Sequence, residues 1–164
     1  MKMLKITPCL LALLLILQNI CLAHPSISDK QAVLGWVTIF DTKEKVEEIY
    51  GKPKSITDTY NHFCEAYVTV YDYGNSFEIT FNKDTNKVCL ISTREPNGIK
   101  LSNGITVGSS MYDVERKLGR RYDNTMAIYK PYPLCYHAHV SLKLGFDKNG
   151  KVSDIILCHF DVNK

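Results

Sequence analysis

The chain has 164 residues, with 20 lysines and arginines against 17 acidic residues and a formal net charge of +3 at pH 7. Residues 1–23 contain two of the lysines and no acidic residue, so the remaining 141 residues are almost neutral. Such a balance lacks the clustered basic charge of a nucleic-acid-binding domain, and we expect no nucleic-acid partner. A chain of this length forms one ordinary domain or two very small ones, with a modest core.

Residues 1–23 have the pattern of a signal peptide. Two lysines form a positive start, an apolar run covers residues 10–17, and Ala23 ends a small-residue cleavage pattern. Polar residues interrupt the run well short of the roughly 20 apolar residues that a membrane span needs. We therefore predict cleavage after Ala23 and export of residues 24–164 to the periplasm or the medium, without a membrane span.

Four cysteines follow the signal segment, and an even number in a small exported protein predicts two disulfides. They are Cys64, Cys89, Cys135 and Cys158. Four cysteines allow three pairings, which their number alone leaves open. No two of them form a CxxC pair, so the spacing of a zinc ribbon or of a thioredoxin-like redox site is missing.

Two stretches, 37–51 and 105–119, align without a gap. Each begins with an apolar-Thr-apolar triplet, continues with a hydroxyl residue and ends at a glycine. Thr42 and Ser110 are expected to cap helices, because their hydroxyls accept orphan amides of the first turn. Glycine takes the left-handed conformation that commonly ends a helix. Apolar residues between these signals recur at spacings of three and four, which predicts two short amphipathic helices.

After each predicted helix the hydrophobic period changes from 3.6 to 2, the period of a strand. The expected strands cover residues 67–73, 76–81 and 88–91 in the first half, and 125–129, 140–146 and 152–158 in the second. Gly74-Asn75 and Asn149-Gly150 are expected turns. The sequence thus predicts an α+β protein of two tandem repeats, each a short helical segment packed on a three- to four-stranded antiparallel meander sheet.

The first repeat covers residues 24–93 and the second 105–164, joined by a linker at 94–104. Each repeat carries one cysteine before or within its meander and one in its last strand. This arrangement favours pairing within each half, which closes loops of about 25 residues worth roughly 3 kcal/mol each. The predicted bridges are Cys64–Cys89 and Cys135–Cys158.

The second stretch and its last strand resemble a known repeat. The sequence Ile-Thr-Val-Gly-Ser-Ser at 105–110, followed by Asp113-Val114, Leu118-Gly119 and Gly150-Lys151-Val152, is similar to the repeat unit of β-lactamase-inhibitor-like (BLIP-like) proteins. It is also similar to small envelope lipoproteins of the SmpA/OmlA type, which carry one copy. The resemblance covers nearly all of residues 34–160. It implies two units, each a helical segment on a four-stranded sheet, that together present a concave sheet surface. The lipidation cysteine of the SmpA type is missing, and no contact residue of the inhibitors is recognisable.

Tyrosines gather in one predicted strand. Period 2 places Tyr67, Tyr71 and Tyr73 on one side, with Val68 and Val70 on the other. The valines are expected to face the core, which leaves the tyrosines outward as binding residues. Tyrosine is favoured at interfaces because it offers a large rigid surface with a polar tip. Ordinary cross-strand packing of tyrosines fits the pattern equally well. Tyr129, in the second half, is a further binding candidate.

His137 and His139 share one side of a predicted strand, and His159 lies in the last strand. Imidazoles two residues apart can ligate a metal together, but no obligatory third ligand is visible. Two solvated histidines at a binding surface are the simpler interpretation. No serine stands in a nucleophile-elbow context, and the cysteines are assigned to bridges. We therefore expect no catalytic residue, no bound metal and no cofactor.

These features predict an exported, monomeric and non-catalytic protein that binds another protein through a tyrosine-rich sheet face. If the partner is an extracellular or periplasmic enzyme, the chain is an inhibitor. Two other functions stay open. One is a periplasmic envelope-maintenance or assembly factor, as the SmpA resemblance implies, and the other is a histidine-dependent metal-binding enzyme.

Overall fold

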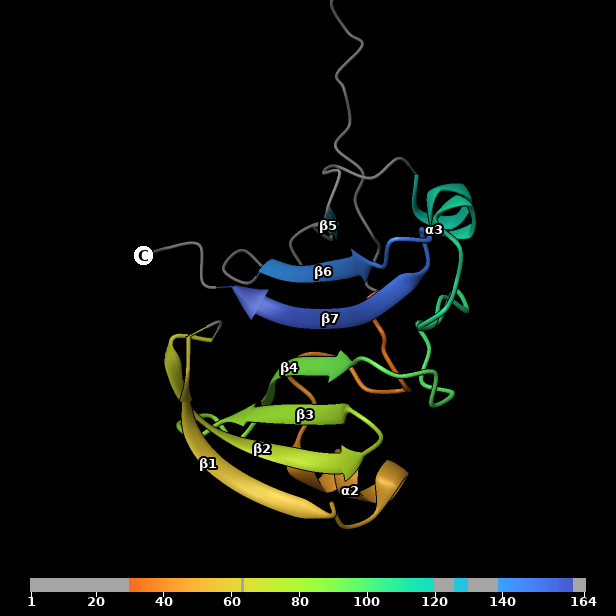
Figure 1. Ribbon diagram of the computed structural model, residues 1–164. Coiled ribbons are helices and arrows are strands. Elements are labelled where there is room, and N and C mark those ends of the chain that lie inside the picture. Colours follow the sequence, from red (N-terminus) through yellow and green to blue (C-terminus); the bar gives the residue numbers. More distant parts are fainter. Residues whose placement is uncertain (1–29, 63, 120–125, 130–138, 161–164) are drawn as a thin grey trace, which may run out of the picture.

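The structure, a computed structural model, describes residues 30–62, 64–119, 126–129 and 139–160. Its helices are α2 (Lys43–Tyr50) and α3 (Met111–Leu118), and its strands are β1 (Ser55–Asn61), β2 (Ala66–Gly74), β3 (Phe77–Asn82), β4 (Val88–Thr93), β5 (Met126–Tyr129), β6 (His139–Phe146) and β7 (Val152–Phe160). All of these strands join one antiparallel sheet in the order β1-β2-β3-β4-β7-β6-β5 (Figure 1). The α+β class predicted from the sequence is confirmed. No helix within the described ranges is long and apolar enough to cross a membrane.

Both helices lie where the sequence predicts them. The Thr42 hydroxyl accepts the amide of Lys45 at 3.4 Å, which satisfies an orphan donor at the start of α2. Gly51 has a φ of 71° and donates its amide to the carbonyl of Glu47 at 2.8 Å. The helix therefore ends because glycine turns the backbone where a side chain would be strained.

The two halves of the chain meet at their last strands. β4 and β7 pair antiparallel, with Ile91 opposite Leu157 and Thr93 opposite Ile155. From this seam outward the strands follow in reverse chain order on both sides, from β4 to β1 on one side and from β7 to β5 on the other. Both halves thus share one continuous sheet (Figure 1).

The larger core cluster lies on one face of the sheet. Cross-strand partners share a face, and Ile79, Ile91, Leu157 and Leu142 form such a row across four strands, each fully buried. α2 and the chain before it cover this face, behind the sheet as Figure 1 shows it. The segment expected as a linker contributes too, because Leu101 is buried and donates its amide to Ile105 at 2.8 Å.

The orientation predicted for β2 is wrong. Tyr71 lies on the covered face, where only 6% of it is exposed, and its ring meets Phe81 edge-on with the centroids 4.8 Å apart. The Tyr71 hydroxyl donates to a carboxylate oxygen of Glu47 in α2 at 3.2 Å. Val68 and Val70 therefore point to the opposite face. The period of a strand fixes which residues share a face, but the position of the helix decides which face is covered.

Tyr50 and Tyr73 pack against each other with ring centroids 5.3 Å apart, and burial raises the pKa of each from 10.0 to about 12. An unfolded chain releases these phenol protons near pH 10, whereas the folded chain holds them to about pH 12. The stability that they contribute is therefore complete below pH 10 and is lost as the pH rises to 12. We expect the urea midpoint to fall over this range, and to fall less steeply for Tyr50→Phe. Equal slopes for the two proteins would contradict the assignment.

Candidate functional site

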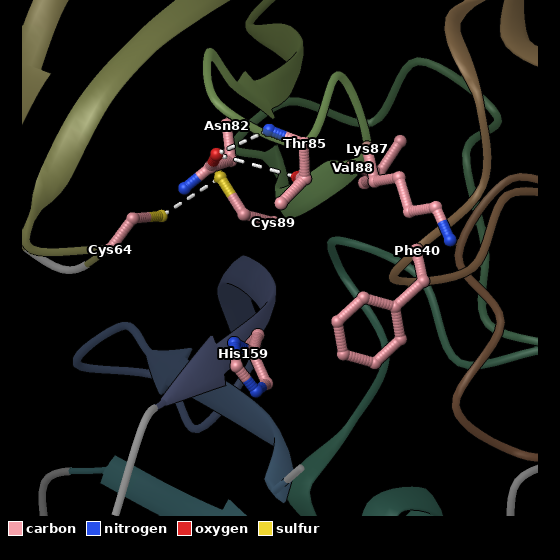
Figure 2. A pocket seen from close by; sticks show the side chains of 8 residues that line it. All are labelled: Phe40, Cys64, Asn82, Thr85, Lys87, Val88, Cys89 and His159. Atoms are coloured by element: carbon pink, nitrogen blue, oxygen red, sulfur yellow. Dashed lines mark hydrogen bonds between the residues drawn. The ribbon is translucent and has the colours of Figure 1, made fainter.

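A cavity of about 350 Å³ opens at the end of the sheet where β7 finishes (Figure 2). Three segments that are distant in sequence border it together with the β3–β4 turn. Phe40 comes from the loop before α2, Cys64 from the β1–β2 connection and His159 from β7. Residues of the range 82–89 complete the lining. The cavity thus lies at the junction between the two halves of the chain.

Phe40 forms an aromatic wall of the cavity together with His159. Their ring centroids are 5.0 Å apart in an edge-to-face arrangement, and 38% of Phe40 remains exposed. The φ of Phe40 is 73°, in the left-handed region that bulky residues rarely adopt. Its amide donates to the carbonyl of Val88 at 2.8 Å, which ties the loop to the start of β4.

The second half of the chain shows what this backbone position needs. Gly108 is the residue aligned with Phe40, and it has a φ of 91°. Its amide donates to Val152, at the start of β7, also at 2.8 Å. Glycine makes this bond without side-chain strain, so the backbone geometry does not require an aromatic residue. The shape of this turn therefore does not explain why residue 40 is a phenylalanine.

The turn between β3 and β4 forms the polar side of the cavity. The side-chain oxygen of Asn82 accepts the amides of Asp84 at 2.9 Å and Thr85 at 3.0 Å, which fixes the turn. The backbone amide of Asn82 also donates to the carbonyl of Lys87 at 2.9 Å. Among the lining residues only Lys87 carries a fixed charge. The cavity therefore combines an apolar and aromatic wall with one cationic group, which favours ligands that carry an acceptor or a negative charge.

Two thiols form a further wall. The sulfurs of Cys64 and Cys89 lie 3.0 Å apart (Figure 2). Cys89 occupies a bulge of β4, between the pair Thr80–Leu90 and the pair Phe81–Val88. Hydrogen bonding to Cys89 lowers the pKa of the Cys64 thiol, while the same contact and burial raise the pKa of Cys89. The two cysteines predicted to pair are therefore in contact, and the covalent bridge itself stays a prediction.

The other predicted pair is only partly described. Cys158 is fully buried on the face of the sheet opposite the larger core cluster, in a small cluster with Leu90 and Ile156, and Cys64 packs against this cluster. Burial raises the pKa of the Cys158 thiol to about 12. Cys135 lies outside the described residues, so its pairing with Cys158 stays a prediction.

The remaining predicted site residues are dispersed. Tyr67 is well exposed, at 69%, whereas Tyr71 and Tyr73 pack beneath α2 and away from the cavity. Tyr129 belongs to β5 and His139 to β6, but their side chains are outside the description, as is all of His137. In the ranges that the structure describes, no group of three or more histidine, cysteine or acidic side chains is placed to hold a metal ion.

Sequence reasoning missed Phe40 and Lys87 as site residues. The alignment that identified the helices already contained a signal, because it places Phe40 on Gly108. An aromatic residue aligned with a glycine indicates either that the backbone differs between the two positions or that the side chain serves a surface role. Phe40 and Gly108 share a positive φ, so the backbone does not differ and the surface role is favoured.

No protein-family model matches the chain, and no curated protein matches it. Two solved structures are similar in part. An extracellular protein containing an SCP domain from Bacillus anthracis str. Ames gives a TM-score of 0.49 at 11% identity, over 82% of this chain and 46% of that one. A DUF4309 family protein (YjgB) from Bacillus subtilis subsp. subtilis str. 168 gives 0.40 at 12% identity, over 73% and 79%. The chain spans less than half the length of the SCP-domain protein, and similarity this low identifies neither a family nor a function.

Proposed function

We propose that the chain is an exported, non-catalytic protein-binding module, and that the cavity beside Phe40 receives a side chain of the partner. The observation that carries the proposal is the strained backbone of Phe40, with its partly exposed ring, at a position where the second half has glycine. A residue in such a conformation costs of order 1–3 kcal/mol, and strain of this kind clusters at functional sites.

The dimensions and chemistry of the cavity support a protein partner. At about 350 Å³ it is at the small end of ligand sites, large enough for one bulky side chain of another protein. Binding energy at protein interfaces concentrates in such anchors, which fill well-packed pockets. Lys87 at the polar side favours an acidic residue next to that anchor. An enzyme of the periplasm or the medium is a suitable partner, which would make this chain an inhibitor.

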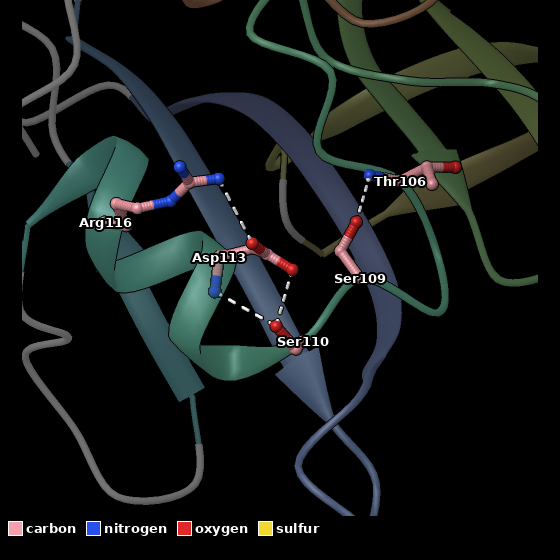
Figure 3. Close-up of polar contacts among 5 residues, drawn as sticks. All are labelled: Thr106, Ser109, Ser110, Asp113 and Arg116. Carbon is pink, nitrogen blue, oxygen red and sulfur yellow. Dashed lines mark hydrogen bonds and ion pairs between the residues drawn. The ribbon is translucent and has the colours of Figure 1, made fainter.

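Two tandem units are part of the proposal, with the cavity at their junction. The turns before the two helices have matching bonds, since Thr106 donates its amide to the Ser109 hydroxyl at 3.0 Å (Figure 3) and Thr38 donates its amide to the Asp41 carboxylate at 2.8 Å. Ser110 then caps α3 as Thr42 caps α2. The mirrored strand order about the β4–β7 seam supports two units related by an approximate two-fold rotation.

A comparison of three immobilised baits tests this function. Residues 24–164 of the wild type, Phe40→Gly and Tyr112→Ala are exposed to culture medium and envelope extract of the producing organism. Tyr112 is a matched control because it is an exposed aromatic residue of α3. We expect one partner to bind the wild type and Tyr112→Ala, with Phe40→Gly weakening its affinity by about 2 kcal/mol or more. Phe40→Gly should change stability by no more than about 1 kcal/mol, because relieved strain offsets the lost ring contact.

Three results would argue against parts of this proposal. Equal binding by Phe40→Gly and the wild type would remove the cavity as the site. Recovery of envelope-assembly components in place of an enzyme would favour the envelope-maintenance function. A catalytic activity of the purified chain that His159→Ala abolishes would show that the chain is an enzyme.

A further inference from the structure

The outer edge of β1 is open. β1 ends the sheet within the described part of the chain, and its residues from Ser55 to Tyr60 are all exposed. It pairs with β2 without a bulge along its whole length, and it contains neither proline nor lysine. A bulge, a proline or a lysine commonly protects a natural edge strand, because a regular open edge is a template for another strand.

Exposed apolar side chains accompany this edge. Ile56 and Tyr60 lie on one face of β1, with 58% and 44% of their surfaces exposed. Tyr67 of β2 lies opposite Tyr60, and their rings meet edge-on with the centroids 5.4 Å apart. The patch of Ile56, Tyr60 and Tyr67 thus borders a row of backbone groups that no strand of the described chain covers.

The sequence of β1 reads the same in both directions by type of side chain. Around Asp58 it runs polar, apolar, threonine, aspartate, threonine, apolar, polar. When two copies pair antiparallel with Asp58 at the centre, Ile56 lies opposite Tyr60 and Thr57 opposite Thr59 of the second copy. Such self-complementarity is what a two-fold interface requires, because both copies present the same surface. It favours a second copy of the same chain as the partner of this edge.

We propose that β1 pairs with β1 of a second copy of this chain, antiparallel and about a two-fold axis at Asp58, so that one sheet continues across a homodimer. The pairing satisfies the outer backbone groups of both strands and covers four exposed apolar side chains, Ile56 and Tyr60 of each copy. It departs from the monomer expected from the sequence, and it does not depend on the Phe40 cavity.

The centre of the interface limits its strength. Two Asp58 carboxylates face each other there, and like charges directly opposite are destabilising. Each is partly compensated by its own chain, since Asp58 accepts the Thr69 hydroxyl at 2.8 Å and lies 2.7 Å from the Lys83 ammonium. A single pair of edge strands is also a small interface. The dimer is therefore weak and depends on protein concentration.

Sedimentation equilibrium of residues 24–164 over a wide concentration range tests the association. We expect a reversible dimer that Ile56→Asp weakens about tenfold or more, because the new carboxylate lies opposite Tyr60. Asp58→Asn should strengthen it a few-fold by removing the like charges. Tyr112→Asp, an exposed aromatic residue changed in the same way on α3, is the control and should have no effect. A chain that stays monomeric throughout, or a dimer that Ile56→Asp leaves unchanged, overturns the proposal.

Cross-linking tests the register. With the axis at Asp58, the two copies of this residue lie about 5 Å apart, whereas the two copies of Ser55 lie about 20 Å apart. Asp58→Cys should therefore form a disulfide-linked dimer on a non-reducing gel, and Ser55→Cys should not. Both side chains are exposed, and circular dichroism checks that each variant folds. Cross-linking by Ser55→Cys but not by Asp58→Cys would replace this register with another and contradict the proposal.

Discussion

Tyr71→Ala is expected to lower the free energy of unfolding by about 3 kcal/mol or more, the usual cost of deleting a large buried aromatic side chain. The change removes the edge-on contact with Phe81 and leaves a cavity under α2. It also removes the hydroxyl that donates to Glu47. Urea denaturation followed by circular dichroism measures the loss, and Tyr71→Phe should cost only about 1 kcal/mol because it deletes the hydrogen bond alone.

Tyr67→Ala is the matched control for this substitution, because it changes the same residue type four positions earlier in the same strand. Tyr67 is well exposed, so its removal should alter stability by no more than about 0.5 kcal/mol. A stable Tyr71→Ala beside an unfolded Tyr67→Ala would mean that the buried part of this face of β2 has been assigned to the wrong end of the strand.

The helices could be predicted because their signals are local. A hydroxyl residue, a run with period 3.6 and a glycine stand within ten residues of one another, and each acts on the helix that contains it. α2 accordingly begins after Thr42 and ends before Gly51. The hairpin strands were predictable for the same reason, since period and turn residues are properties of short segments.

β1 was not predicted, because a strand that is exposed along nearly its whole length has no buried side to reveal it. Its two threonines alternate with an isoleucine, an aspartate and a tyrosine, which form no apolar row. Pairing with β2 makes this segment a strand. The covered face of β2 escaped prediction for a related reason. Either face satisfies period 2, and only the packing of α2, with Glu47 placed to accept the Tyr71 hydroxyl, distinguishes them.

The cavity required tertiary structure. Phe40, Cys64 and His159 are separated by at least 24 residues along the chain, and no sequence pattern joins them. The bulge that places Cys89 in the lining is a shift in register, which strand periodicity does not reveal. The Phe40–Gly108 difference was visible in the sequence, but its meaning depends on the positive φ that both residues adopt.

Cys64→Ser is expected to destabilise the oxidised protein by about 3 kcal/mol, the loop-entropy value for a bridge that closes 25 residues. Peptide mapping without reductant should first show Cys64 joined to Cys89. If the effect comes from the bridge, Cys89→Ser alone and the double variant should each lose about as much as Cys64→Ser, since one bridge can be lost only once. Two cysteines that contributed by packing alone would give losses that add.

The structure also indicates which other pairing of Cys64 is possible. Cys64 packs against the cluster that holds Cys158, so a Cys64–Cys158 bridge is the alternative nearest in space. Such a bridge would join the two proposed units, leave Cys89 as a thiol, and make the Cys64→Ser and Cys158→Ser double variant no less stable than either single variant. The 3.0 Å contact favours Cys89, because the two sulfurs already lie close to the separation that a bridge needs. A peptide that joins Cys64 to Cys158 would contradict the pairing within halves, whatever the variants' stabilities.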